Sequence, residues 1–237
     1  MSGFITLMKR EFMVYFYSPM AYAIMAVFMF LAGFLFLSSL LVRQDAGIMR
    51  EFLSSLSILT LIISPMITMR LFAEEKKSGT IEMLMTAPVR DAAIVLAKFT
   101  AAVFFYLLII SPTVSYIIIL KVYGNPDFGS IISGYIGLIC TTMVFFSVGI
   151  CVSAMTSNQI VCAVVTFIIL MALLMMDFLA NYTSGTLRHI LDYADFKTHM
   201  VSFAKGLIDT RDIVFFLSTS AFFLFITIKA VESRRWK

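Results

Sequence analysis

The chain of 237 residues is 61% hydrophobic and only 14% charged, and its mean hydropathy is +0.98. A soluble domain contains about 45–50% apolar and about 25% charged residues, so a soluble fold of this length could not hide so much apolar surface from water. A disordered chain is excluded by the same figures, and the composition predicts an all-α integral membrane protein in a lipid bilayer. The net charge of +4 is therefore interpreted through the positions of the cations and not as a nucleic-acid-binding signature.

The first element in the chain is a predicted amphipathic helix over residues 4–16. Lys9 and Arg10 fall on one side of this helix. The opposite, apolar side consists of Phe4, Leu7, Met8, Phe12, Tyr15 and Phe16. Such a helix is typical of the membrane–water interface, although a basic flank that only sets the topology would have a similar sequence. Ser18 and Pro19 then end this helix and begin the next one, because proline is favoured at a first helical position.

Six stretches are apolar and long enough to cross about 30 Å of hydrocarbon as helices. They are residues 20–42, 53–72, 95–120, 131–155, 160–180 and 212–231. If both termini are cytoplasmic, eleven Lys and Arg residues lie inside and seven outside, which favours this orientation. We expect residues 1–237 to form a single multi-pass transmembrane domain.

The connection between the second and third spans predicts a short cytoplasmic helix over residues 80–86. Gly79 suits the left-handed conformation that ends a helix, Thr80 suits an N-cap, and Glu82 lies near the positive helix start. The apolar stripe of this helix consists of Ile81, Leu84 and Met85. Pro88 suits the first position of the helix that follows. The stripe indicates either a helix resting on the bilayer or one that fits a groove on a partner protein.

Two spans contain a Ser-Pro pair inside their apolar runs, Ser64-Pro65 in the second and Ser111-Pro112 in the third. Proline removes a helical hydrogen bond and should kink both helices, and the serine hydroxyls can satisfy freed backbone groups. Pro65 and Pro112 are candidate hinges, and static kinks that shape the bundle fit the sequence equally well.

The fourth span contains small residues at a spacing that lets helices approach closely. They are Gly129, Ser133, Gly137, Gly149 and Ser153. This pattern predicts helix packing and indicates no substrate-binding role.

Near the outer end of the fifth span lies Asp177, an acid within an apolar run. Intramembrane acids are costly and often functional, but a side chain this close to the interface can also reach water or a loop. The outer loop 181–211 then predicts an amphipathic extracytoplasmic helix. Its apolar stripe consists of Phe196, Met200, Phe203, Ala204 and Leu207.

Motifs for catalysis and cofactor binding are missing from the sequence. Cys140, Cys151 and Cys162 all lie in apolar runs and are interpreted as small buried hydrophobes. His189 and His199 have no companions at metal-ligand spacing, so we expect no metal site. No phosphate-binding loop or nucleophile elbow is present. The sequence therefore predicts no ATPase site, no catalytic residue and no cofactor, and energy for any work on a substrate would come from elsewhere.

The stretch from Met69 to Val89, MRLFAEEKKSGTIEMLMTAPV, resembles the membrane subunit of ABC-2 type ABC transporters. The stretch from Phe203 to Ser218, with GLIDTRDIVFFLS, is similar to the same proteins. Together they resemble a bacterial subgroup that includes gliding-motility-associated permeases of the Gld type and the copper-processing Nos-type permease.

This resemblance implies a permease in the bacterial inner membrane, most simply an exporter. It implies two such subunits, identical or related, that form the pathway, and a separate ABC ATP-binding subunit that holds the ATP and Mg²⁺. The coupling helix that docks on that subunit would run from about Glu74 to Pro88, and it would include Glu75. The resemblance also leaves room for an extracytoplasmic accessory protein and implies an outer helix over the exit of the pathway.

Two other functions stay open at this stage. A secondary transporter would need no ATPase, but intramembrane charges and an inverted repeat, which such transporters use, are not evident. An ATP-driven mechanical or scaffold component would move no substrate, and the Gld-type resemblance keeps that function in view. The substrate itself is not indicated by the sequence.

Overall fold

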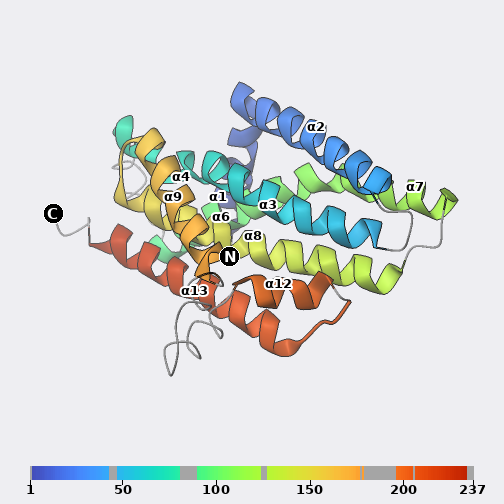
Figure 1. Ribbon diagram of the computed structural model, residues 1–237. Helices are drawn as coiled ribbons and strands as arrows, with labels where there is room; N and C mark the ends of the chain where they lie inside the picture. The colour runs from blue at the N-terminus through green and yellow to red at the C-terminus, as the bar shows by residue number, and fades with distance from the viewer. Residues whose placement is uncertain are drawn as a thin grey trace.

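The computed structural model describes residues 2–42, 47–80, 90–123, 127–176, 178, 196–204 and 206–233. Within these ranges every regular element is a helix (Figure 1). The helices are α1 (Ser2–Tyr17), α2 (Pro19–Val42), α3 (Ile48–Thr68), α4 (Arg70–Lys77), α6 (Asp91–Ile110), the 3-10 helix η1 (Ser111–Val114), α7 (Ser115–Tyr123), α8 (Phe128–Met155), α9 (Gln159–Leu174), α12 (Phe196–Ala204) and α13 (Thr210–Glu232). The predicted helix over 80–86, apart from Thr80, and Asp177 lie outside the described residues.

Five helical stretches in the described part of the chain are long and apolar enough to cross a membrane. They are Pro19–Leu41, Ile48–Lys77, Asp91–Val122, Phe128–Met155 and Thr210–Glu232. The protein is therefore a multi-pass membrane protein. α9 falls within the predicted fifth span but has only 16 residues, so a sixth span stays a prediction.

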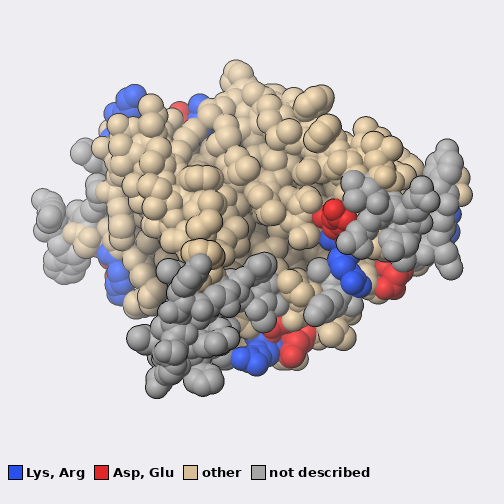
Figure 2. Space-filling view, in the orientation of Figure 1, with Lys and Arg blue, Asp and Glu red and all other residues tan. Residues whose placement is uncertain are grey.

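Charged side chains are unevenly distributed over the surface. In the space-filling view, uncharged residues cover the middle of the visible face, and Lys, Arg, Asp and Glu gather towards its ends and lower edge (Figure 2). A broad uncharged band between charged ends is what a bilayer requires of a protein that crosses it.

α8 is the central helix of the bundle and contacts α3, α4, α6, α9, α12 and α13. In its most apolar window 83% of the residues are buried, against 28% for α2 and 22% for α13. Its start is capped by Asp127, whose carboxylate accepts hydrogen bonds from Gly129 N at 3.1 Å and Ser130 Oγ at 2.6 Å. The Ser130 hydrogen bond is the main cause that lowers the pKa of Asp127 below its ordinary value.

Small residues on α8 allow these close contacts, as their spacing predicts. A Cβ atom added to Gly149 would lie 2.0 Å from Thr68 Oγ1, and one added to Gly137 would lie 2.6 Å from Phe203 Cβ. Ser133 Oγ donates to Phe203 O at 2.6 Å. The packing role predicted for this helix is confirmed at these positions, and Gly129 instead belongs to the Asp127 cap.

Each Ser-Pro pair satisfies the carbonyl that its proline leaves without a donor. Ser64 Oγ donates to Leu61 O at 3.1 Å, and Leu61 is four residues before Pro65. Ser111 Oγ donates to Leu108 O at 2.9 Å, in the same relation to Pro112. α3 continues through its proline, whereas α6 tightens into η1 at the second one. The two prolines therefore occupy different local structures.

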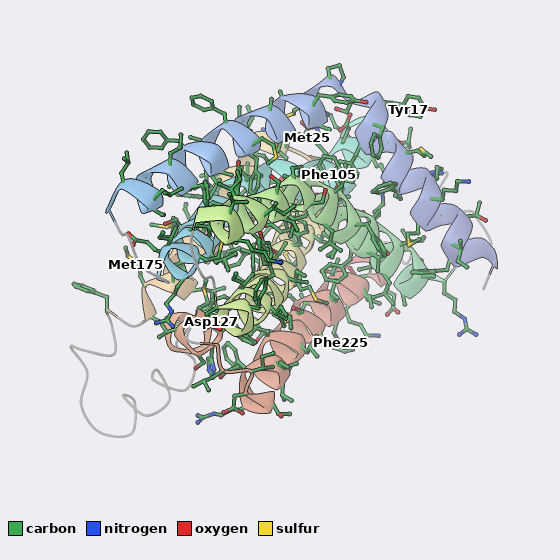
Figure 3. All side chains as sticks on the ribbon, turned by 90° about the vertical axis from the view of Figure 1, so that its right-hand side faces the viewer. Tyr17, Met25, Phe105, Asp127, Met175 and Phe225 are labelled. Carbon is green, nitrogen blue, oxygen red and sulfur yellow. The ribbon has the colours of Figure 1, made fainter. Side chains whose placement is uncertain are left out.

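The N-terminal helix lies outside the main direction of the bundle. α1 turns away from α2 at the corner after Tyr17 and packs along α6 (Figure 3). α2 exposes large apolar side chains, including Phe30 at 75% and Phe34 at 62%, as a lipid-facing helix does. α1 and α2 are therefore adjacent in sequence but pack against different parts of the bundle.

Candidate functional site: the root of the segment between α4 and α6

α4 is held by the last turn of α8. α3 ends at Thr68 and α4 begins at Arg70, after Met69, and the first N–H groups of a helix have no partner within it. Ser153 Oγ accepts hydrogen bonds from Phe72 N and Ala73 N, both at 3.1 Å, and donates to Met69 O at 3.2 Å. Lys76 Nζ donates to Ala154 O. A side chain of α8 thus caps one end of α4, and the end of α8 binds the other.

The end of α4 follows the sequence prediction in part. Gly79 has a φ of +72°, the left-handed conformation expected of it. The Thr80 hydroxyl hydrogen-bonds to Ser78 Oγ at 2.8 Å and to Glu75 O at 3.4 Å, and the helix that it is predicted to cap lies outside the described residues. It therefore supplies a donor to one of the carbonyls at the end of α4, which need donors once the helix stops.

A buried lysine at the start of α6 joins three helices. Lys98 is 1% exposed, and its Nζ lies 2.9 Å from Glu11 Oε2 of α1 and 2.6 Å from Glu75 Oε1 of α4. Nζ also lies 5.2 Å from the centre of the Phe72 ring. Arg10 Nη2 binds the other Glu11 oxygen at 2.9 Å. Two positive and two negative charges therefore balance, and we call Glu11, Glu75 and Lys98 the charge triad.

Two further contacts tie the region around the end of α1 to α3 and α4. Arg70 Nη1 donates to Ser18 Oγ at 2.7 Å. Tyr15 donates its hydroxyl proton to Ile67 O at 3.4 Å, and its ring stacks on Phe105 at 4.4 Å between centroids. Burial raises the pKa of Tyr15 far above its ordinary value, so this hydroxyl stays a neutral donor.

A cleft of about 450 Å³ opens beside the charge triad. Its polar lining includes Arg70, Glu75 and Lys98, and its apolar lining includes Ile24 and Met66. Glu75 Oε2 and Arg70 Nε are buried and have no hydrogen-bond partner among the described residues. The cleft is lined by residues of α1, α2, α3, α4 and α6.

The residues predicted as a site are only partly brought together. Glu75 lies in the charge triad, while Glu74 is exposed, with an oxygen 3.8 Å from Arg70 Nε. Pro65 lies one turn before the break at Met69. Pro112 lies in η1, at the far end of α6 from Lys98. Ile81, Glu82, Leu84, Met85 and Pro88 lie outside the described residues.

Sequence reasoning missed Glu11, Lys98 and Ser153 as members of this region. Lys98 counted only as a cytoplasmic cation, and Glu11 was absent from the predicted helical faces. A lysine four residues inside a predicted span was a usable signal, because a charge at that depth needs a partner. The identity of the partner was not predictable, since Glu11 is 87 residues away.

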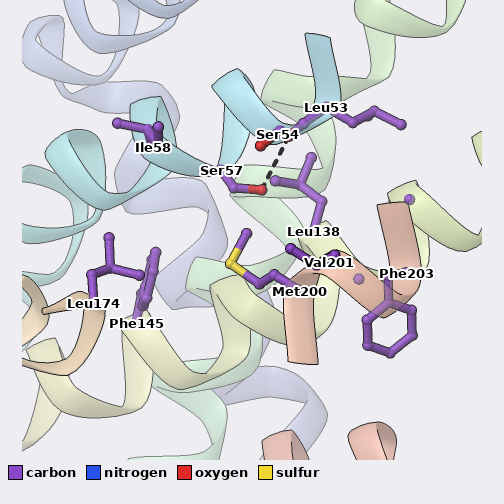
Figure 4. A pocket seen from close by; sticks show the side chains of 12 residues that line it. Leu53, Ser54, Ser57, Ile58, Leu138, Phe145, Leu174, Met200, Val201 and Phe203 are labelled. Carbon is purple, nitrogen blue, oxygen red and sulfur yellow. Dashed lines mark hydrogen bonds between the residues drawn. The ribbon is translucent and has the colours of Figure 1, made fainter. Parts of the chain in front are cut away.

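A second feature lies at the other end of the bundle. α12 is a helix where the outer stripe predicts one, and His199 Nδ1 lies 2.5 Å from Asp212 Oδ1 of α13, with both residues buried. Beside α12 lies a mostly apolar cavity of about 240 Å³, lined by residues such as Leu53, Phe145 and Met200 (Figure 4). Ser57 lies in the wall of this cavity, and its hydroxyl already donates a hydrogen bond to Leu53 O at 3.0 Å.

The chain matches a family model described as ABC-2 family transporter protein over residues 7–173, well over half of its length. The match runs from α1 to α9 and includes the whole charge triad. No curated protein matches the chain.

Proposed function

The chain belongs to the ABC-2 family of transporter proteins and is a membrane permease component of that family; from this premise we propose that it is the permease half of an ATP-driven exporter. Two such subunits, identical or related, form the pathway in this proposal. A separate ATP-binding subunit holds ATP and Mg²⁺ and supplies the energy. The family match is the observation that carries the proposal, and the Met69–Val89 stretch supports the narrower placement among Gld-type and Nos-type permeases.

The proposed coupling element is the segment from Glu74 to Pro88. It connects α4 to α6, so its movement would reach both proline-bearing spans directly. Support comes from α4, where this segment begins, because α4 is fixed to α8 through Ser153 and to α6 through Lys98. Because α4 is firmly held, a displacement of the coupling segment is transmitted to α6 and α8. A loosely attached loop would absorb the same displacement.

The proposed orientation places both termini in the cytoplasm of a bacterial inner membrane. Glu75, Lys98, Ser153 and the end of α13 would then lie on the cytoplasmic side. α12 and the His199–Asp212 pair would lie on the outer side, where an extracytoplasmic accessory protein could reach them. The excess of Lys and Arg at the predicted inner ends supports this orientation.

The test is co-purification with the ATP-binding subunit that is encoded beside this chain. We expect a stoichiometric complex in mild detergent that hydrolyses ATP. Glu82→Arg combined with Leu84→Asp should abolish complex formation, because it reverses a charge and breaks the apolar stripe of the docking helix. The change lies outside the predicted spans, so the amount of folded permease should be unchanged.

A matched control is Glu232→Arg, a charge reversal near the exposed end of α13, which should leave the complex intact. Normal complex formation by the Glu82/Leu84 double variant would contradict the docking assignment. A permease that purifies folded but never captures the ATP-binding subunit would contradict the proposed function and favour a secondary transporter or a scaffold.

A further inference from the structure

Lys98 is the member of the charge triad that contacts both of the others. Glu11 reaches it from α1 and Glu75 from α4, and these residues are 87 and 23 positions away in the sequence. A buried ammonium group that loses these carboxylates without reaching water is left uncompensated, at a large cost in free energy. The three helices therefore meet at a contact that resists being pulled apart.

We infer that Lys98 is a positioning residue for energy coupling, which joins α1, α4 and α6 into one body that moves together when the segment after α4 is displaced. The inference rests on the proposed function, because it assigns a partner element to the proposed coupling segment. It gives the N-terminal helix a mechanical role, where its sequence alone indicated a helix resting on the membrane surface.

Two parallel contacts strengthen the link between α1 and the spanning helices. Tyr15 binds Ile67 O, and Arg70 binds Ser18 at the end of α1. With Glu11, these contacts are spread over two turns of α1 on the side that faces α3, α4 and α6. α1 is thus held along a line, which prevents rotation about a single contact.

α2 follows α1 directly, but it packs on α3 through apolar side chains, such as Phe36 against Phe52, and not through charged groups. Its sequence from Pro19 to Val42 contains no charged residue, and only 28% of its most apolar window is buried. Because α2 has no charged group that could join the triad, we place the boundary between the moving body and α2 at the corner formed by Ser18.

The decisive variant removes every charge of the triad at once, Glu11→Gln with Glu75→Gln and Lys98→Met. No buried charge is left unpaired, so the permease should fold, since neutral replacements of buried ion pairs are often tolerated. The matched control is Lys229→Met with Glu232→Gln, which removes an exposed ion pair of α13. Lys98→Arg keeps the positive charge and should retain partial function.

The movement is measured with pairs of spin labels in the complex with the ATP-binding subunit. One pair replaces Met13 of α1 and Lys77 of α4, and the other replaces Met13 and Phe34 of α2; Met13 and Phe34 are 42% and 62% exposed, and Lys77 is also exposed. We expect the Met13–Lys77 distance to stay constant between the nucleotide-free and ATP-trapped states, while the Met13–Phe34 distance changes. In the neutral triad the Met13–Lys77 distribution should broaden.

ATP hydrolysis by the complex should fall about tenfold in the neutral triad, because a coupling segment that is no longer pre-organised engages its partner less well. The Lys229/Glu232 control should hydrolyse ATP at the parental rate. A neutral triad with parental hydrolysis and an unchanged Met13–Lys77 distribution would overturn the inference.

The inference and the proposed function fail in different ways. If the parental chain captures no ATP-binding subunit, the proposed function is wrong. The Met13–Lys77 distribution of the permease alone still decides whether the triad joins the helices. If the neutral triad does not fold, Glu75→Gln alone is the second variant, because Glu75 is the most exposed member at 19%. It should broaden the same distribution, and an unchanged one would count against the inference.

Discussion

At the scale of single residues, a glycine of α8 is as important as any charged group. Gly149 brings the backbone of α8 against Thr68, one residue before the break that starts α4. Ser153, one turn later, supplies the hydrogen bonds that the break requires. The sequence spacing predicted close packing here, but it did not indicate that the packed neighbour would be the root of the proposed coupling segment.

Gly149→Ala should destabilise the permease by about 1–3 kcal/mol, the usual cost of forcing an extra methyl group into a packed interior. The added Cβ would lie 2.0 Å from Thr68 Oγ1 and 2.7 Å from Thr68 Cβ, so α3 and α8 would have to separate. Gly33→Ala is the matched control in α2, where the nearest atom lies 3.4 Å away. Thermal unfolding in detergent measures both, and equal melting temperatures would contradict this account of α8.

At the scale of whole elements, the two Ser-Pro pairs show how a spanning helix tolerates proline. Each serine donates to the carbonyl that its proline leaves free, which is necessary where no water can do so. The sequence predicted this use of the hydroxyls. It did not distinguish the continuous helix at Pro65 from the 3-10 turn at Pro112, because that depends on how each helix packs against its neighbours.

Ser64→Ala should destabilise the permease by about 1–2 kcal/mol, because Leu61 O then has no donor in a buried site. Adding Pro65→Ala should recover most of that loss, since alanine restores the backbone N–H that reaches the same carbonyl. Unfolding measured for the two single variants and the double variant forms a complete cycle. Additive effects would show that the hydroxyl does not compensate for the proline.

The same Pro65→Ala variant also separates a hinge from a static kink. If Pro65 is a hinge, ATP hydrolysis by the complex should change while stability is kept. Parental activity in both Pro65→Ala and Pro112→Ala would favour static kinks.

At the scale of the whole molecule, α8 is long enough to cross the bilayer. Ser130 lies 3.1 Å from where Gly206 would carry a Cβ, and Ala154 O binds Lys76 at the other end of α8. The 24 residues between these points span roughly 36 Å at 1.5 Å per residue, more than the hydrocarbon thickness. The end of α4 and the start of α13 are therefore expected on opposite sides of the membrane.

Single cysteines at Lys77 and Leu207 should test this arrangement in intact cells and in inverted vesicles. Both positions are exposed, and the three native cysteines are buried and should give little background labelling. We expect a membrane-impermeant maleimide to label Lys77→Cys only from the cytoplasmic side and Leu207→Cys only from the outside. The opposite pattern would reverse the proposed orientation. Labelling of both cysteines from the same side of the membrane would contradict the span arrangement.

The sequence by itself determined the protein class, the helical content, the left-handed turn at Gly79 and the serine hydrogen bonds beside the two prolines, because these depend on composition or on neighbours within one turn. Only the tertiary structure decided which faces are buried and which charges meet. In water, a polar face marks the outside of a helix, but in lipid the outward face is as apolar as the core, so the pattern that normally separates them is lost. The pairing of Lys98 with Glu11 and Glu75, like that of His199 with Asp212, therefore had to come from the packing of helices distant in the chain.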